Sequence, residues 1–357
     1  MTSRSRTEKA SLPSISNIAA ATAQTPQEAA QDLVFMAQCP LTNTLAASRA
    51  TRRNTTTDII TGLSETINGD LIIRSPKGSE LRAQDFALLD LLIVEATKTG
   101  RKSAEVSLSL SEYMKMRGLK DRKAARESVR DSLERLFNAV VSYSTKVSYK
   151  GKCYSGIVDG RFCSEKGVLE HGFIYFRFSE KMAAMLPGMP VSQFPTLMWQ
   201  IDMQKNPDSY SVCRKIYTNY YMNRNEKPPR HQRDTLSVSA LLEGMPGIPT
   251  KEEVRRSGRH FRQQIIDPFE ANLNALEDMH MLSWEYRKAK GAYFTKEELE
   301  NMDFAMFEKA CVKFTFIVDP EPSQTAIDAE KRKRIEVKKK ATREANNRRA
   351  PVKKGAE

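Results

Sequence analysis

The chain of 357 residues is long enough for two ordinary domains. Its 57 Lys and Arg against 44 Asp and Glu give a formal charge of +13, which indicates a polyanionic partner, most simply nucleic acid. No apolar run approaches the roughly 20 residues of a membrane span, and no apolar segment follows the basic N-terminus, so we expect neither a membrane protein nor a secreted one. Five scattered cysteines without a C-x-x-C pair are typical of reduced cytoplasmic thiols.

The two ends of the chain differ in composition from its middle. Residues 1–60 are rich in Ala, Ser, Thr and Gln, and we expect them to be mostly disordered, apart from a short helix over Glu28–Gln38. Residues 326–357 form a basic tail, because the last 30 residues hold 12 Lys and Arg against 5 Asp and Glu, a net +7. Between these ends we expect two domains, over residues 61–200 and 201–325.

The first of these domains follows the order of a winged helix-turn-helix: helix, strand, helix, turn, helix and hairpin. The Asn68-Gly69 pair predicts an additional hairpin before it. Ser111 and Asp121 are the expected N-caps of the second and third helices, and Gly118 suits the end of the second. The predicted elements are a helix from Asp85 to Gly100, a strand at Glu105–Leu110, helices at Ser111–Arg117 and Asp121–Asn138, hairpin strands at Val140–Tyr149 and Tyr154–Phe162, and a further strand at Phe173–Phe178.

The third helix of this domain carries candidate DNA contacts. Its apolar residues repeat at helical spacing and form a core face, while its basic residues lie on an adjoining side. A charged helix side is usually only solvated, and this helix also contains Glu127, Asp131 and Glu134. The glycine turn, the capped helix and the trailing hairpin together nevertheless favour DNA contact. The predicted core face is Ala125, Val129, Leu133 and Leu136, and the candidate contacts are Lys120, Arg122, Lys123, Arg126 and Arg130.

A similar pattern returns in the second domain, residues 201–325. Thr250 with Glu253 is a capping-box pattern and predicts a basic helix, which Gly258 weakens and Pro268 kinks or breaks. Its charged side, like the first, could be merely solvated. The other expected elements are a Tyr-rich helix spanning Tyr210 to Tyr220, a strand at Thr235–Val238, a helix capped by Ser239, and wing strands at Met281–Tyr286 and Val312–Val318. The candidate DNA contacts are Lys251, Arg255, Arg256, Arg259 and Arg262.

Two stretches carry a family resemblance that covers residues 62–320. They are LSLSEYMKMRGLKDRKAARESVRDSLERLFNAVVSY in the first domain and DTLSVSALLEG, FRQQIIDPFEANLNAL and MLSWEYRK in the second. Two winged-helix units of this kind resemble the initiator proteins of iteron-type plasmids and related mobile elements. The resemblance implies an α+β fold of two winged helix-turn-helix domains in tandem. It also implies that the protein binds double-stranded DNA at origin repeats and promotes opening of the origin. Its implied partners are host replication proteins (the helicase or its loader), and it is implied to form a homodimer.

Enzymatic signatures are missing from the sequence. The four histidines are isolated and form no His-hydrophobe-His pair, so a strand-nicking initiator would lack its metal ligands. No phosphate-binding G-x-x-x-x-G-K-[ST] loop occurs. We therefore expect a cytoplasmic, non-enzymatic initiator without a cofactor or metal. The alternatives are a winged-helix transcriptional regulator, the disfavoured strand-nicking initiator, and a scaffold whose basic faces bind acidic proteins.

Overall fold

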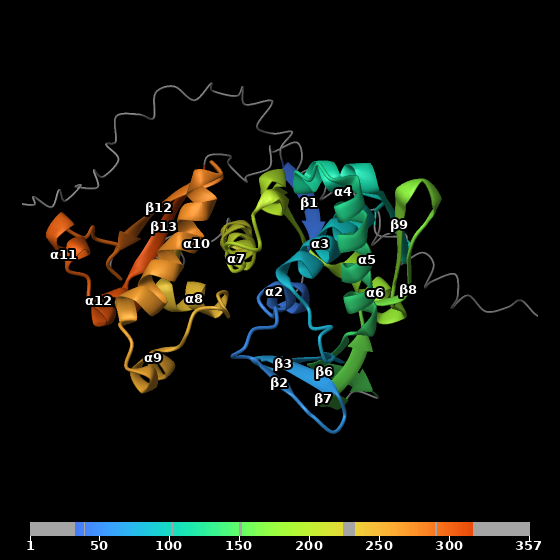
Figure 1. Cartoon of the computed structure of the whole chain (residues 1–357), viewed down its shortest axis with the longest axis horizontal. Helices are drawn as coiled ribbons and strands as arrows, with labels where there is room; N and C mark the ends of the chain where they lie inside the picture. The colour runs from blue at the N-terminus through green and yellow to red at the C-terminus, as the bar shows by residue number, and fades with distance from the viewer. Residues whose placement is uncertain are drawn as a thin grey trace, which may run out of the picture.

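The computed structural model describes residues 33–38, 40–100, 103–149, 152–223, 233–289 and 291–316 (Figure 1). They form an α+β fold of two winged-helix units in tandem, which confirms the predicted fold class. Residues 1–32 and the basic tail lie outside the described residues, as do both residues of the turn predicted at Lys150-Gly151.

The first unit is built on three helices and a three-stranded sheet. Strand β5 pairs with β9, and β9 pairs with β8, so the sheet order is β5-β9-β8. The helices are α3 (Ala83–Lys98), α4 (Leu110–Arg117) and α5 (Arg122–Asn138), and the strands are β5 (Glu105–Ser109), β8 (Cys163–Val168) and β9 (Phe173–Phe178). The wing is therefore the β8–β9 hairpin.

The hairpin predicted as the wing belongs to a different sheet. Its strands β6 and β7 extend a five-stranded sheet of order β2-β3-β4-β6-β7, at the lower edge of the unit in Figure 1. The alternation along Val140–Tyr149 predicted a strand but did not show with which strand it pairs. In the structure it pairs with β4, because Leu71 and Ile73 of β4 and Val141 of β6 are then buried together beneath the helices. The strands are β2 (Thr55–Thr57), β3 (Leu63–Asn68), β4 (Leu71–Pro76), β6 (Val140–Tyr149) and β7 (Lys152–Arg161).

Ordered structure begins earlier in the chain than the sequence predicted. Strand β1 (Leu33–Ala37) pairs antiparallel with β10 (Val191–Pro195), and helix α2 (Pro40–Ala46) follows. The helix expected over Glu28–Gln38 is therefore wrong for the described part of that range. The short apolar run of β1 finds its strand partner in β10, far along the chain, and Met36 and Ala37 are completely buried there.

The second unit repeats the winged-helix order after a connecting segment. The segment holds α6 (Glu180–Met185), β10 and two short 3₁₀ turns. The sheet order of the unit is β11-β13-β12, which confirms a second wing, with α11 and α12 between its strands. The elements are α7 (Ser209–Met222), β11 (Thr235–Ser237), α8 (Val238–Glu243), α9 (Lys251–Ser257), α10 (Asp267–Asp278), β12 (Leu282–Arg287), α11 (Lys296–Glu300), α12 (Phe304–Lys309) and β13 (Cys311–Phe316).

Two predicted N-caps lie two residues too late in the chain. Ser109, not Ser111, accepts the hydrogen bond from the Glu112 amide, and Ser237, not Ser239, accepts that of Ala240. In both places an S-x-S sequence offers two serines, and only the first lies at the end of a strand with the extended backbone of an N-cap.

Helix α7, the first helix of the second unit, lies on the side that faces the first unit (Figure 1) and packs against elements of both units. From α7, Arg214 donates to both carboxylate oxygens of Asp90 in α3, at 2.6 and 2.7 Å. Tyr210 donates its hydroxyl hydrogen bond to the same carboxylate, and Arg214 also reaches Gln38 beside β1. The side chains of Arg214 and Asp90 are each 2% exposed, so a buried ion pair joins the two units.

Candidate nucleic-acid interface

The turn between α4 and α5 has the geometry of a helix-turn-helix. Gly118 adopts a left-handed backbone (φ 64°) that ends α4, and the Leu119 amide bonds back to the Met114 carbonyl at 2.9 Å. Asp121 then starts α5 by accepting hydrogen bonds from the amides of Lys123 and Ala124, at 2.8 and 3.0 Å. Both predicted roles, of Gly118 and Asp121, are confirmed.

Helix α5 separates an apolar face from a basic one. The predicted core residues Ala125, Val129, Leu133 and Leu136 are all buried, which confirms that face. All five basic candidates of this unit are exposed: Lys120, Arg122, Lys123, Arg126 and Arg130. Within the described part of the chain none of the five has a carboxylate at ion-pair distance, so their charges stay available to an external anion.

The acidic residues of α5 are partly neutralised from within the unit. Glu134 pairs with Lys166 of the wing strand β8, and this hydrogen bond lowers the pKa of Glu134. Asp131 is exposed and lies near Arg135, whose guanidinium donates to the buried Asp85 at 2.8 Å through two nitrogens. The turn and the first half of α5 hold five exposed basic side chains against the two exposed carboxylates of Asp121 and Glu127.

The wing turn lies beside the start of α5. A Cβ at Gly172 would lie 3.2 Å from a terminal guanidinium nitrogen of Arg122, so the arginine rests on this turn. His171 and Gly172 both have positive φ (58° and 82°), which turns the chain tightly and leaves Leu169 half exposed at the tip. Sequence reasoning missed these wing residues, although the His171-Gly172 pair between two alternating segments is a turn signal that could have located them.

The second basic helix is split in two. The helix capped by Thr250 and Glu253, as predicted, ends at Ser257, and Gly258 takes a left-handed backbone (φ 64°) as its C-cap. A new helix starts near Phe261 with a π-helical turn, Arg262–Ile266, directly before Pro268. The i→i+5 bond of the Asp267 amide to the Arg262 carbonyl absorbs the irregularity that Pro268 was expected to cause as a kink or break.

The five basic candidates of the second unit fall into different environments. Arg255 and Arg256 close α9, Arg259 lies in the turn, and Arg262 opens the next helix; all four are exposed. Arg262 lies 3.5 Å from Asp267, an exposed and therefore weak pair. Lys251, in contrast, already has partners within the protein. It pairs with Glu308 at 2.9 Å, and its ammonium lies 4.9 Å from the centre of the Phe304 ring.

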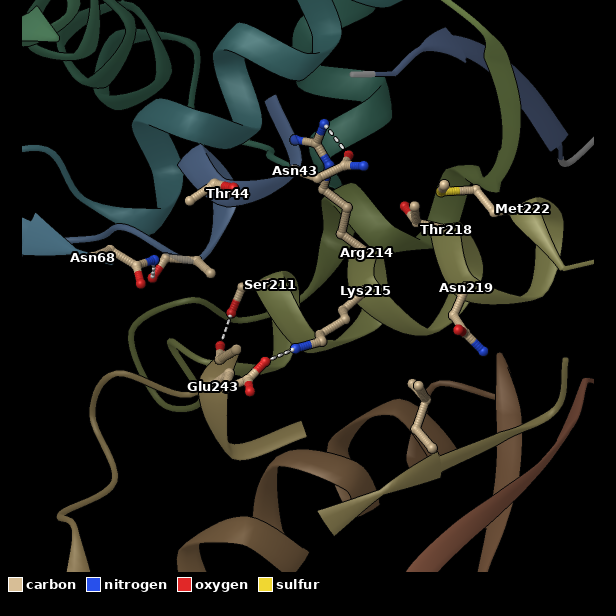
Figure 2. Close-up of a pocket in the computed structure, with 13 residues that line it drawn as sticks. Asn43, Thr44, Asn68, Ser211, Arg214, Lys215, Thr218, Asn219, Met222 and Glu243 are labelled. Carbon is tan, nitrogen blue, oxygen red and sulfur yellow. Dashed lines mark hydrogen bonds and ion pairs between the residues drawn. The ribbon is translucent and has the colours of Figure 1, made fainter. Parts of the chain in front are cut away.

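A pocket of about 340 Å³ opens between α2, α7 and α8 (Figure 2). Its charges are matched within the protein, because Lys215 pairs with Glu243 at 2.9 Å and Arg214 pairs with Asp90. The described charged residues that line the pocket therefore leave no unpaired charge for an anionic ligand.

Two nucleophilic side chains, those of Tyr217 and Cys163, are buried. Burial raises the pKa of Tyr217 well above its ordinary value, and its hydroxyl donates to the Met281 carbonyl at 3.2 Å. Burial likewise raises the pKa of Cys163 to about 12. Among the described residues no three His, Cys, Asp or Glu side chains gather as a metal site, and no helix is long and apolar enough to cross a membrane.

Fold and basic faces together define a tandem winged-helix protein. Residues 70–197 match the family described as Initiator Replication protein, WH1. This match lies within the first unit and confirms the resemblance drawn from the sequence. No curated protein matches the chain.

Several solved structures are similar to the chain. Two are crystal structures of domains 2 and 3 of RctB. One has 14% identity and a TM-score of 0.39, covering 77% of this chain and 96% of that one; the other has 13% identity and a TM-score of 0.43, covering 78% and 99%. A third is the WH1 domain of MSBI1.176, a replication protein isolated from a multiple sclerosis patient, with 19% identity, a TM-score of 0.24 and coverage of 29% and 77%.

Proposed function

We propose that the protein is a sequence-specific, double-stranded DNA-binding replication initiator of a plasmid or mobile element. It binds repeats at an origin and promotes opening of the adjacent DNA. The observation that carries the proposal is the exposed basic cluster at the start of α5, which has no carboxylate at ion-pair distance among the described residues and lies in the segment that matches the initiator WH1 family. Arg and Lys there offer the donors that guanine edges and phosphates accept.

Further parts of the proposal rest on the sequence pattern and on the family. The sequence pattern places the two domains at residues 61–200 and 201–325, and strand β2, which precedes residue 61, pairs with β3 of the first. From the family we infer that host replication proteins such as the helicase or its loader are partners and that the protein forms a homodimer in the cytoplasm. A transcriptional regulator would bind the same kind of DNA without opening it. Footprinting on supercoiled DNA that contains the gene's flanking repeats, with a probe for unpaired thymines, separates the two functions, because only an initiator exposes an A·T-rich stretch beside its footprint.

The basic tail should contribute affinity without sequence preference. Deleting residues 328–357, which lie outside the described residues, should flatten the dependence of binding on salt by about 0.9 log units per log unit of salt for each phosphate that the tail neutralises. Preference between target and random duplex should stay unchanged, because a basic arm contacts phosphates rather than bases. Titrations at several salt concentrations measure both quantities. A truncated protein without sequence preference but with an unchanged salt slope would contradict this role.

DNA cleavage is not expected. Supercoiled origin DNA incubated with the protein and Mg²⁺ or Mn²⁺ should stay unnicked, since no His pair is present to hold the metal and Tyr217 is buried. Gel analysis of topology, with protease treatment to reveal covalent adducts, measures this. A tyrosyl–DNA adduct would overturn the non-enzymatic assignment.

A further inference from the structure

Two arginines of the first unit reach across to the second. Arg49, in the loop before β2, donates to Asp208 at the start of α7, with nitrogen–oxygen distances of 2.9 and 2.7 Å. The side chain of Asp208 is only 4% exposed, and its other oxygen accepts the Gly247 amide at 3.1 Å. One carboxylate therefore connects the first unit to the turn that precedes α9.

Arg53 contacts the same turn at a second point. Its guanidinium donates to the backbone carbonyls of Pro246 (3.1 Å) and Ile248. It also pairs with Glu253 at 2.6 Å. Glu253 at the same time accepts the amide and hydroxyl of Thr250, both at 2.8 Å, in the capping box of α9. The hydrogen bond from Arg53 lowers the pKa of Glu253 to about 2, so the carboxylate is ionised at neutral pH.

The loop that presents these arginines is itself fixed to the first unit. Asn54 accepts hydrogen bonds from the amide and hydroxyl of Thr51, both at 2.8 Å, and donates to the Arg49 carbonyl at 3.1 Å. The Ala50 amide bonds to the Leu81 carbonyl at 2.8 Å, at the foot of α3. The two guanidinium groups are therefore mounted on a closed, hydrogen-bonded loop.

The fit between loop and turn is close. A Cβ at Gly247 would collide with the Arg49 guanidinium and lie 2.6 Å from the Asp208 carboxylate, so this contact requires glycine. In Figure 1 the loop before β2 points toward the α8–α9 connection, at the lower edge of the molecule, whereas α7 joins the units nearer their middle. Two separated attachments suppress a pivoting motion that the α7 contact alone would permit.

We propose that Arg49 and Arg53 form a latch that fixes α9 and the basic turn after it relative to α5. The protein thereby selects DNA sites by the spacing of their two halves. The inference rests on the proposed function. Its physical basis is the helical repeat of DNA: two extra base pairs rotate one half-site by about 70° around the axis, so only a rigid pair of readers is sensitive to the change.

The test uses a duplex site selected by the full-length protein from a random-sequence library, together with versions carrying two base pairs inserted or removed between the two footprinted halves. Wild type should lose at least about tenfold in affinity on the altered sites, as expected when one of the two readers disengages. Arg53→Ala and Gly247→Ala should lose less than about threefold, because the second unit can then follow the displaced half-site. Arg52→Ala is the matched control, since Arg52 is exposed and makes no hydrogen bond or ion pair within the described ranges of the chain.

The outcomes separate three explanations. Wild type that selects no sequence refutes the proposed function. Wild type that is spacing-selective, with both variants equally selective, refutes the latch while leaving the function intact. A uniform loss of affinity on all spacings means that Arg53 only stabilises α9, and also refutes the latch. The affinity that Arg53→Lys loses on altered spacings should lie between the losses of wild type and of Arg53→Ala. A lysine ammonium can pair with Glu253, but it lacks the planar guanidinium that also donates to both carbonyls.

Discussion

Replacing Arg214 by Ala should lower the free energy of unfolding by about 3–5 kcal/mol. The substitution leaves the carboxylate of Asp90 buried without its cation, and the Tyr210 hydroxyl alone cannot compensate that charge. Because the pair joins α3 to α7, its removal should loosen the packing between the two units as well as the core. Urea unfolding followed by circular dichroism measures the change.

The neighbouring residue provides a matched control for this effect. Lys215 on the same helix also pairs with a carboxylate, but its partner Glu243 has a side chain that is 75% exposed. Lys215→Ala should therefore cost no more than about 1 kcal/mol. The double variant Asp90→Leu, Arg214→Met should recover part of the stability, since it removes both buried charges. Equal effects of Arg214→Ala and Lys215→Ala would contradict the importance of the buried pair.

Replacing one basic residue in each unit should relax sequence preference at different halves of the DNA site. Arg126→Ala should weaken sequence preference at one half of the site and Arg259→Ala at the other. Each should cost about 1–3 kcal/mol of binding free energy if the side chain makes two hydrogen bonds to guanine. Both side chains are exposed, and the two lie in separate units on either side of α7. The double variant should lose nearly the sum, because residues that share no partner act independently.

Footprints and competition binding with each variant measure these effects, with Lys296→Ala on α11 as a control for loss of one surface charge. Lys296 is exposed and lies 3.8 Å from Glu300 on α11, a helix that Figure 1 shows apart from α9 and α5. Blurring of the same base pairs by both variants, or a loss of affinity equal on all sequences, would contradict reading by two units and favour a single reader with phosphate contacts elsewhere.

Much of the local structure could be predicted from the sequence. The start of α5 at Asp121, the end of α4 at Gly118 and the capping box of Thr250 are confirmed, because each depends on atoms within three or four residues. The buried face of α5 follows from helical periodicity in the same way, and the exposure of its basic face accompanies it.

Long-range pairing decided the remainder. The sequence predicted strands at Val140–Tyr149 and Phe173–Phe178 but did not show which of them forms the wing. Alternation of apolar and polar residues indicates a strand, but it does not indicate the strand with which it pairs. The ion pair of Lys251 with Glu308 joins residues far apart in the chain. The hydrogen bond from Arg53 to the Pro246 carbonyl, in the turn before α9, does the same. Such contacts depend on where separate elements meet.

The sequence by itself therefore determined the tandem winged-helix architecture, the helix boundaries at Gly118, Asp121 and Thr250, and the location of the basic segments. Only the tertiary structure decided which arginines remain free for a ligand and which are committed to holding the units together. The physical reason is that a helix cap is satisfied within one turn of chain, whereas the fate of a surface charge depends on which carboxylate or carbonyl folding brings beside it.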